Sequence, residues 1–272
     1  MNIVLTKKTA QQIENAEVDA LTSRLSAIQQ IEGNPMDVAM RKFGNAMAFS
    51  VKNIPGPSFN KVLGITAGEE KYIEEILDFY KKRDIPARFE ITPAYSTPEL
   101  FHYFNERGFF QTDFHSTLYT PELNNNYIDE RTTDPFIRIR KLKGNEFDLF
   151  ADIYTKGFQL PEFLKSGIAK NNEVLYDQDN WTFYLAMVDD NPAGIGVLFT
   201  KGSVGSLAAS ATIPVFRNKG VHQALIRRRL SDALDQGCQT VVAQAKFGSI
   251  SQNNMERNGL RIAYTKSMMV KN

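Results

Sequence analysis

The stretch ATIPVFRNKGVHQALIRRRL, residues 211–230, decides the interpretation of the whole chain. It follows an apolar segment and opens an amphipathic helical pattern. Arg217 and Lys219 stand at the start of that helix, where the helix macrodipole disfavours each cation by about 0.3 to 1 kcal/mol, and no acid follows until Asp232. A bound anion would remove this conflict, because helix-start amides, Gly220 and two cations together suit a pyrophosphate. The alternative is an ordinary strand-to-helix turn with exposed basic residues.

The segments around this loop recur in the first half of the chain. Both halves are predicted to end with a helix, a strand, a second helix, a glycine and a final strand, at residues 221–270 and 69–120. The two glycines, Gly108 and Gly259, lie 151 positions apart (259 − 108). A repeat of that length indicates two related domains and not a solenoid. We expect a first domain at 1–122, a polar, turn-rich linker at 123–136 and a second domain at 137–272.

The remaining segments predict a sheet in each half. Residues 7–31 predict one or two surface helices. Short runs rich in Val, Ile, Phe and Met predict strands at 38–43, 47–52, 61–65, 137–142, 181–188, 193–199 and 206–212. Further helices are expected near 97–107, 146–156 and 161–170. Each domain is therefore predicted to be α/β (α+β), with a mixed, mostly antiparallel sheet flanked by helices.

The composition excludes several kinds of protein. The 272 residues are 42% hydrophobic and 23% charged, and 32 basic against 31 acidic side chains create no field that would attract nucleic acid. Cys238 is the only cysteine, so an internal disulfide is excluded. No apolar stretch approaches the ~18 residues of a membrane span, and the start of the sequence has no signal-peptide core. We therefore expect a cytoplasmic protein without a membrane or nucleic-acid partner.

The motif RNKGVH at residues 217–222, preceded by Thr-Ile-Pro, resembles the R/Q-x-x-G-x-G/A loop of the GNAT acetyltransferases. Residues 237–266 look like the strand, helix and final strand that close that fold, and residues 181–199 look like its central hairpin. In the first half, FNKVLGI at 59–65 and ITPAYSTPELFHYFNERGF at 91–109 resemble the degenerate N-terminal copy of tandem GNAT proteins. The resemblance implies two tandem GNAT folds, of which only the second holds the cofactor.

The same resemblance implies the cofactor and the residues that contact it. Acetyl-CoA would bind in the V-shaped opening between two parallel strands that end near Thr212 and Ala245, and an amine would attack the thioester directly. A backbone N–H near Thr212 or Ile213 would stabilise the oxyanion, and such a donor is typically worth about 10² to 10³ in rate. No metal is expected. The residues expected to contact the cofactor are Ala211, Thr212, Ile213, Arg217, Asn218, Lys219, Gly220, Val221, His222, Ser251 and Asn254.

Three positions depart from the family pattern. His222 stands where the family usually has Gly or Ala; its imidazole either contacts phosphate or carries a proton, or it points away from the cofactor. Met255 stands where many members place a tyrosine that protonates the leaving thiolate, and a thioether cannot donate a proton. Gly248 replaces a usual Asn, and Ser249 with Gln252 suggests a capping box for the next helix.

The general base and the acceptor stay open. The strand at 206–212 has no carboxylate, so Glu162 and Glu173, in the region where GNAT proteins bind acceptors, are the candidate bases, with solvated surface acids as the alternative. The leading hypothesis is acetyl transfer to an amine of a small molecule or a protein side chain, by a monomer or homodimer. The second is a CoA-binding sensor or scaffold that has lost catalysis. The third, amino-acid transfer from aminoacyl-tRNA as in some tandem GNAT proteins, is disfavoured because RNKGVH is present and no long helical arm is visible.

The first half lacks room for a second cofactor. Only residues 66–68 separate its predicted strand at 61–65 from the next helix. Glu69 and Glu70 stand at the start of that helix, where they would repel a diphosphate. We therefore expect one acetyl-CoA per chain and a structural role for the first half.

Overall fold

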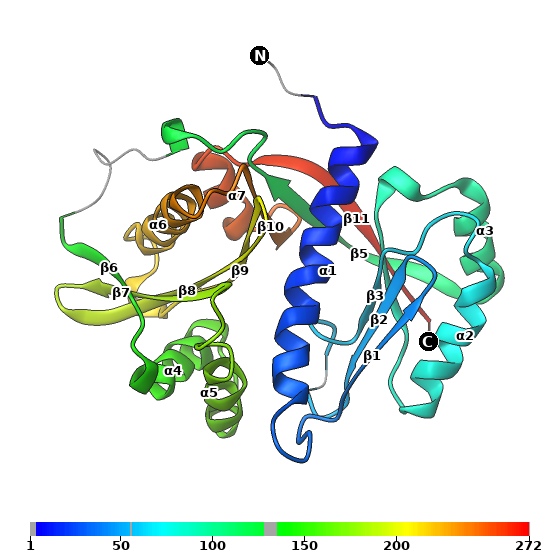
Figure 1. The fold of residues 1–272 in the computed structure, drawn as a ribbon, viewed down its shortest axis with the longest axis horizontal. Coiled ribbons are helices and arrows are strands. Elements are labelled where there is room, and N and C mark those ends of the chain that lie inside the picture. Colours follow the sequence, from blue (N-terminus) through cyan, green and yellow to red (C-terminus); the bar gives the residue numbers. More distant parts are fainter. Residues whose placement is uncertain (1–3, 55, 128–134, 272) are drawn as a thin grey trace. The chain divides into compact units, whose positions relative to one another are not determined.

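A computed structural model of the chain describes residues 4–54, 56–127 and 135–271 (Figure 1). The chain forms compact units that interleave along the sequence. Within the described ranges, unit 1 consists of Met1–Thr117, Gln244–Gly248 and Ile262–Asn272, and unit 2 of Leu118–Ala243 and Ser249–Arg261. The contiguous domains expected at 1–122 and 137–272 stay a prediction. Residues 128–134 of the linker expected at 123–136 lie outside the described residues.

Unit 1 contains strands in the order β1-β2-β3-β4-β11-β5. β3 and β4 are parallel, with Val62 opposite Phe89, and β11 runs antiparallel to β4, with Met268 opposite Glu90. The helix expected at 7–31 forms as one helix, because the pattern contains no Gly or Pro to break it. The elements are α1 (Lys7–Gln29), β1 (Val38–Phe43), β2 (Ala46–Val51), β3 (Lys61–Leu63), α2 (Lys71–Lys82), β4 (Arg88–Ile91), α3 (Pro98–Glu106), β5 (Phe109–Tyr119) and β11 (Arg261–Lys271).

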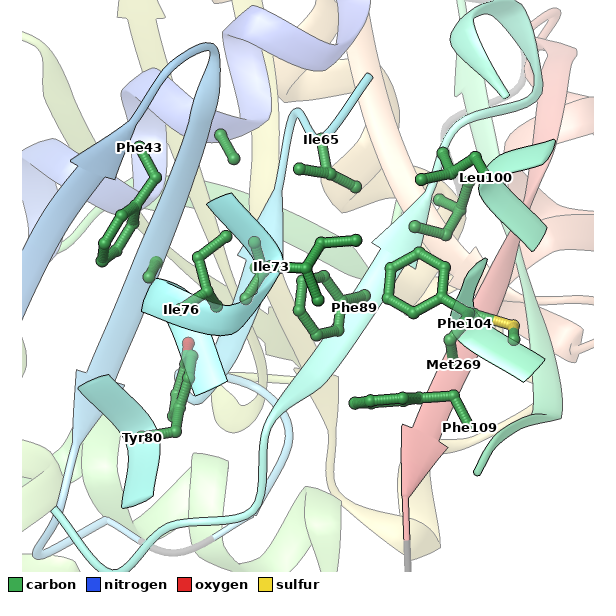
Figure 2. Close-up of a cluster of buried hydrophobic side chains, with 14 residues drawn as sticks. Phe43, Ile65, Ile73, Ile76, Tyr80, Phe89, Leu100, Phe104, Phe109 and Met269 are labelled. Carbon is green, nitrogen blue, oxygen red and sulfur yellow. The ribbon is translucent and has the colours of Figure 1, made fainter. Parts of the chain in front are cut away.

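The core of unit 1 combines aromatic with aliphatic side chains (Figure 2). Phe89 from β4, Phe104 from α3 and Phe109 from β5 meet edge to face, with ring centroids 4.8 to 5.5 Å apart. Ile73 and Ile76 of α2 belong to the same buried cluster. The apolar stripe of this helix therefore faces the sheet, and each such buried side chain contributes about 1.5 to 3 kcal/mol.

Unit 1 also contains a cluster of four charged side chains, of which two are buried and two are partly buried. Lys266 of β11 contacts Glu17 and Glu90, and Lys61 contacts the same two carboxylates, with N–O distances from 2.5 to 3.2 Å. Burial opposes ionisation of Glu90, but the ammonium groups of Lys266 and Lys61 outweigh it and hold the pKa of Glu90 below its ordinary value. This four-residue ion cluster joins α1, β3, β4 and β11.

Unit 2 contains strands in the order β10-β9-β8-β7-β6. Neighbours from β6 to β9 are antiparallel, whereas β9 and β10 are parallel. Asp189 and Asp190, with φ of 47° and 62°, form the two-residue turn between β7 and β8, as a type I′ hairpin requires. The elements are β6 (Ile137–Lys141), α4 (Phe147–Phe158), α5 (Lys165–Glu173), β7 (Trp181–Val188), β8 (Asn191–Lys201), β9 (Val204–Thr212), α6 (Val221–Asp235), β10 (Thr240–Lys246) and α7 (Ile250–Arg257).

Aromatic side chains also fill the core of unit 2. Phe147 and Phe150 of α4 lie 5.1 and 5.5 Å from the ring of Phe183 on β7, and Trp181 lies 4.8 Å from Phe199. Each unit is thus a mixed, mostly antiparallel sheet with flanking helices, which confirms the predicted fold class. In the part of the chain that the structure describes, no helix is both long enough and apolar enough to cross a membrane.

Candidate functional site

The candidate site lies where β9 and β10 separate. Their parallel register joins Val204–Ser206 to Thr240–Val242, and past that point the two strands are no longer paired with each other, although β9 runs on to Thr212 paired with β8. Ala208 is exposed in the middle of β9, although the residues of β8 beside it are buried. Such exposure is expected where a neighbouring strand has moved away. We call the side of β9 opposite β8, from Ala208 to Thr212, the open edge, because β10 no longer pairs with the strand there.

The pairing of β8 with β9 determines which backbone groups face the open edge. The Ile213 N–H donates to the Ala193 carbonyl, 2.9 Å away, and Gly194 stands opposite Thr212. In an antiparallel ladder, residues that bond to one neighbour alternate with residues that face the other side. Thr212 and Ser210 therefore present their N–H groups to the open edge. Of the two oxyanion donors that the resemblance implies, Thr212 faces the open edge, whereas the Ile213 N–H is bonded to Ala193.

A β-bulge lies at the beginning of the open edge. Val197 stands opposite Ala209 and the next residue of β8 stands opposite Leu207, so Ala208 is an extra residue in β9. A bulge bends its strand and increases the local twist. The bend follows Ser206, the last residue of β9 in register with β10, by two positions. The bulge therefore marks the point at which the two strands part.

The loop between β9 and α6 presents free backbone amides. Gly220 precedes the helix with a φ of 83°, a left-handed conformation that favours glycine, and it has no side chain to cap the helix. Asn218 is left-handed as well, at 62°, which Asn tolerates better than most residues. The N–H groups of the first helical turn have no acceptor within the helix. The amides of Val221 and His222 are therefore available to an anion.

The two cations of this loop make local contacts. Arg217 Nη2 donates to the Gly157 carbonyl in the last turn of α4, 2.6 Å away, where the helix dipole also favours a cation. Lys219 Nζ lies 5.4 Å from the centre of the Phe216 ring. Both side chains are exposed. Their expected contact with a diphosphate stays a prediction, and it requires Arg217 to leave Gly157.

The structure brings His222 and Asn254 together. Asn254 Nδ2 lies 3.1 Å from His222 Nδ1, while Asn254 Oδ1 accepts from Arg257. The amide nitrogen therefore donates to Nδ1, which assigns the imidazole proton to Nε2. Burial and the charge of Arg229 lower the pKa of His222 to about 4, so the ring is neutral near pH 7. A neutral ring whose acceptor nitrogen is occupied provides no positive charge for phosphate and is a poor proton acceptor.

The other expected residues after β10 lie in α7. Ser249 Oγ accepts from the Gln252 N–H at 3.2 Å, which confirms one half of the predicted capping box. Ser251 is half-buried in the first turn of the helix. Met255 is buried, with 5% exposure, where the resemblance implies a proton-donating tyrosine. The position that departs most from the family is thus filled by an apolar, enclosed side chain.

The candidate bases lie on the surface. The Glu162 side chain is 74% exposed and lies 3.7 Å from Lys165, and Glu173 is exposed at the end of α5. These positions favour the interpretation of both as solvated surface acids. Among the described residues, His, Cys, Asp and Glu side chains form no group of three that could hold a metal ion.

Arg229 of α6 is buried beneath β8 and β9 and is absent from the residues expected at the site. Its side chain is 1% exposed. Nε donates to the Leu225 carbonyl at 2.9 Å, and Nη1 donates to the carbonyls of Val197 at 3.2 Å and Ala209 at 3.0 Å. Burial lowers the pKa of Arg229 to about 10, so the group is charged near pH 7. A signal was present in the sequence, because Arg229 follows Leu225 by four residues and shares its helix face.

In unit 1, carboxylates of the chain occupy the related position. Glu14 Oε1 accepts from the Gly64 N–H at 3.2 Å and from the Thr92 hydroxyl at 2.8 Å, and these two residues follow the parallel strands β3 and β4. Glu69 Oε2 accepts from the Thr66 N–H at 3.2 Å and hydroxyl at 2.8 Å in the turn before α2. The donors that an anion would use here are therefore bonded to Glu14 and Glu69.

Comparison with known proteins points to one family. Residues 147–257 match the model of the acetyltransferase (GNAT) family. No curated protein has a matching sequence. Three solved structures share the fold over nearly the full length of the chain. They are a GCN5-related N-acetyltransferase from Kribbella flavida (12% identity, TM-score 0.69, covering 96% of this chain and 95% of that chain), a tandem GNAT protein of the clavulanic acid biosynthesis pathway (11%, 0.63, 95% and 95%) and a functionally unknown conserved protein from Staphylococcus epidermidis (13%, 0.63, 90% and 96%).

Proposed function

We propose that the protein transfers an acetyl group from acetyl-CoA to an amine. The match of residues 147–257 to the model of the GNAT acetyltransferase family supports this proposal. The observation that carries the proposal is the open edge of β9, which leads directly to the start of α6. Along this edge the N–H groups of Ser210 and Thr212 suit an amide or thioester carbonyl. At its end the first-turn amides of α6 suit a diphosphate. Acetyl-CoA contains both chemical groups, in that order.

The residues of the loop suit the diphosphate end of this cofactor. Gly220 has no side chain to keep the phosphates from the amides of Val221 and His222. The space beside it is open, because a Cβ there would have only Ile137 near it, 3.5 Å away. The ammonium of Lys219 and the guanidinium of Arg217 supply positive charge beside those amides. Thr212 would pair with the pantetheine through its backbone groups, while Ala211 and Ile213 on either side of it pair with β8. When bound, acetyl-CoA supplies an acetyl group activated as a thioester.

The chain also provides donors for the reaction itself. Negative charge grows on the acetyl oxygen as a neutral amine attacks the carbonyl carbon. The N–H of Ser210, which lies farther along the open edge from the diphosphate than that of Thr212, is proposed to donate to that oxygen, an interaction typically worth about 10² to 10³ in rate. Met255 cannot protonate the departing sulfur, but a thiol with a pKa of ~8.5 leaves tolerably as the anion. The surface positions of Glu162 and Glu173 leave proton removal from the amine to solvent.

An amine-library screen with acetyl-CoA tests the proposal. Release of free thiol, followed with a thiol reagent, should require both acetyl-CoA and an amine, and calorimetry should give one acetyl-CoA per chain. A variant with Ser210 replaced by proline removes one N–H of the open edge and should lower turnover about 10²-fold. A protein that fails to bind acetyl-CoA at millimolar concentration contradicts the proposal.

A second candidate function is that of a CoA-binding sensor or scaffold. Two observations favour it: Met255 fills the usual position of the proton donor, and the candidate bases are exposed surface residues. A sensor would bind acetyl-CoA with the same stoichiometry but release no thiol with any amine. The same screen therefore separates the two candidates.

We also propose that the first half of the chain binds no acetyl-CoA. Glu14 and Glu69 support this, because they already accept from the backbone N–H after β3 and from one in the turn before α2. Two acetyl-CoA molecules per chain in calorimetry would contradict it. Removing the carboxylate with Glu69→Gln should not create a second site, since the short turn at 66–68 stays unchanged.

A further inference from the structure

Arg229 is a buried cation without a carboxylate partner among the described residues. Asp232, the nearest acid on the same helix, is already bonded, since Oδ2 accepts from the Tyr184 hydroxyl at 2.8 Å and Oδ1 accepts from Arg228 at 2.7 Å. Among the described residues, Arg229 Nη2 has no hydrogen-bond partner. Burying a charge without a carboxylate and leaving one of its donors unbonded both destabilise a protein. An apolar side chain of similar length would fill this position at lower cost.

The contacts of Arg229 converge on the bulge of β9. Nη1 donates to the carbonyls of Val197 and Ala209, which stand opposite each other immediately beside the extra residue Ala208. The guanidinium therefore holds both strands at the point where β9 leaves β10. Carbonyls displaced from a regular ladder by a bulge would otherwise lack a full set of donors.

Two glycines on β8 make room for this arrangement. A Cβ at Gly196 would lie 3.1 Å from Arg229 Nε and 3.3 Å from Cζ, closer than side chains normally approach. A Cβ at Gly194 would lie 2.9 Å from Val221 Cγ1 and 3.3 Å from Leu225 Cδ1. The helix therefore packs close to the sheet, and the guanidinium reaches the bulge through space that only glycine leaves free.

We propose that Arg229 is a positioning residue for acetyl transfer. By bonding the carbonyls of Val197 and Ala209 it holds the angle at which the following residues leave the sheet. That angle determines where Ser210 and Thr212 place their N–H groups along the open edge. The inference rests on the proposed function, because the Ser210 N–H is assigned there to the acetyl oxygen and the Thr212 N–H to the pantetheine. Arg229 itself touches neither the cofactor nor the acceptor.

The test compares three variants by turnover and by binding of two ligands. Arg229→Met keeps the side-chain length and removes the donors, and Arg229→Lys keeps the charge with fewer, differently placed donors. Gly196→Ala displaces the guanidinium while leaving it present. The control is Gly205→Ala, whose Cβ would lie 3.1 Å from Val241 and 3.3 Å from Ala233, with the same crowding but no contact to Arg229. Each variant is assayed for kcat, KM, and the dissociation constants of CoA and acetyl-CoA.

A positioning role predicts a separation of kcat from CoA affinity. Arg229→Met should lower kcat about 10²-fold, as a displacement near 1 Å does, with a CoA dissociation constant within about twofold of wild type. The wild-type preference for acetyl-CoA over CoA should disappear in this variant. Arg229→Lys should recover part of kcat and part of the preference for acetyl-CoA. Gly196→Ala should lose less of these two properties than Arg229→Met, and Gly205→Ala should match wild type.

Several results would overturn the inference. It is contradicted if folded Arg229→Met keeps the wild-type kcat and ligand preference, or if its loss of kcat only follows the loss of folded protein. Equal effects of Gly196→Ala and Gly205→Ala on kcat and ligand preference also contradict it. If Arg229→Met fails to fold, Gly196→Ala and its control decide. If the wild-type protein binds acetyl-CoA more tightly than CoA but turns over no amine, the proposed function is refuted. The inference is then decided by whether the variants keep that difference in affinity. If the wild-type protein binds acetyl-CoA no more tightly than CoA, the inference is contradicted.

Discussion

Replacing Gly220 by alanine tests the anion site at the start of α6. Gly220 has a φ of 83°, and an L-residue in that conformation costs roughly 1 to 2 kcal/mol. The added Cβ would meet only Ile137 Cδ1 at 3.5 Å, an ordinary contact, so backbone strain is the main effect on the free protein. The methyl group would also stand beside the amides assigned to the diphosphate. Losing one hydrogen bond to a charged group, about 1.5 to 3 kcal/mol, weakens acetyl-CoA binding roughly 10- to 100-fold.

Gly237 provides a matched control at the other end of the same helix. Its φ is 81°, and a Cβ built there has nothing within 4 Å. Gly237→Ala should therefore lose the same free energy of unfolding in a denaturant titration but keep the wild-type dissociation constant in calorimetry. If Gly220→Ala also keeps that constant while losing stability, the helix start does not bind the diphosphate and the reasoning is wrong.

Three further predictions follow from other parts of the chain. Arg217→Glu should abolish acetyl-CoA binding in calorimetry and lower the melting temperature only slightly, because the side chain is exposed and makes a single described contact, to Gly157. Met255→Leu should retain most turnover in the thiol-release assay, because the buried thioether has no proton to donate. Lys266→Met should lower the free energy of unfolding by about 3 to 5 kcal/mol in a denaturant titration, because it leaves Glu90 buried without this partner, and Glu90→Gln in the same chain should restore part of that loss.

The ion cluster of unit 1 also predicts how stability depends on pH. The lysines hold the pKa of Glu90 and of Glu17 below their ordinary values despite burial. A carboxyl whose folded pKa is depressed stabilises the protein above its unfolded pKa of about 4.3, and that contribution is lost as the pH falls below it. Burial raises the pKa of Glu14, which acts in the opposite direction and favours folding at low pH. Denaturant titrations of wild type and Lys266→Met should therefore converge as the pH falls below about 4.

Local patterns predicted the elements of the fold well. The apolar stripe and the basic C-terminal end of 69–83 identify a helix that the structure places at Lys71–Lys82. The two acids at 189–190, between alternating runs, correspond to the hairpin turn that joins β7 and β8. Both features depend on neighbours within a few residues, which a sequence displays directly. The loop at 217–220 was identified for the same reason.

The rest of the site depends on pairings between distant residues. The bond from the Ile213 N–H to Ala193 removes a donor that the loop motif alone leaves available, and it follows only from the register of β8 with β9. Arg229 stands in a run of three arginines that is typical of a solvated face. Its burial depends on the bulge and on Gly196, some 30 positions earlier, and no local pattern connects these residues.

The pairing of β11 with β4 affects how the protein is made. Ser267 pairs with Ile91, so the partner of β4 is synthesised 176 residues after it (267 − 91). A ribosome adds about 5 to 20 residues per second, so one edge of β4 waits roughly 9 to 35 s for its partner. An unpaired strand edge readily pairs with other chains during such an interval. This edge of nascent unit 1 is therefore open to other chains until β11 emerges, and substitutions that weaken the pairing of β11 should lower the soluble yield of the full chain.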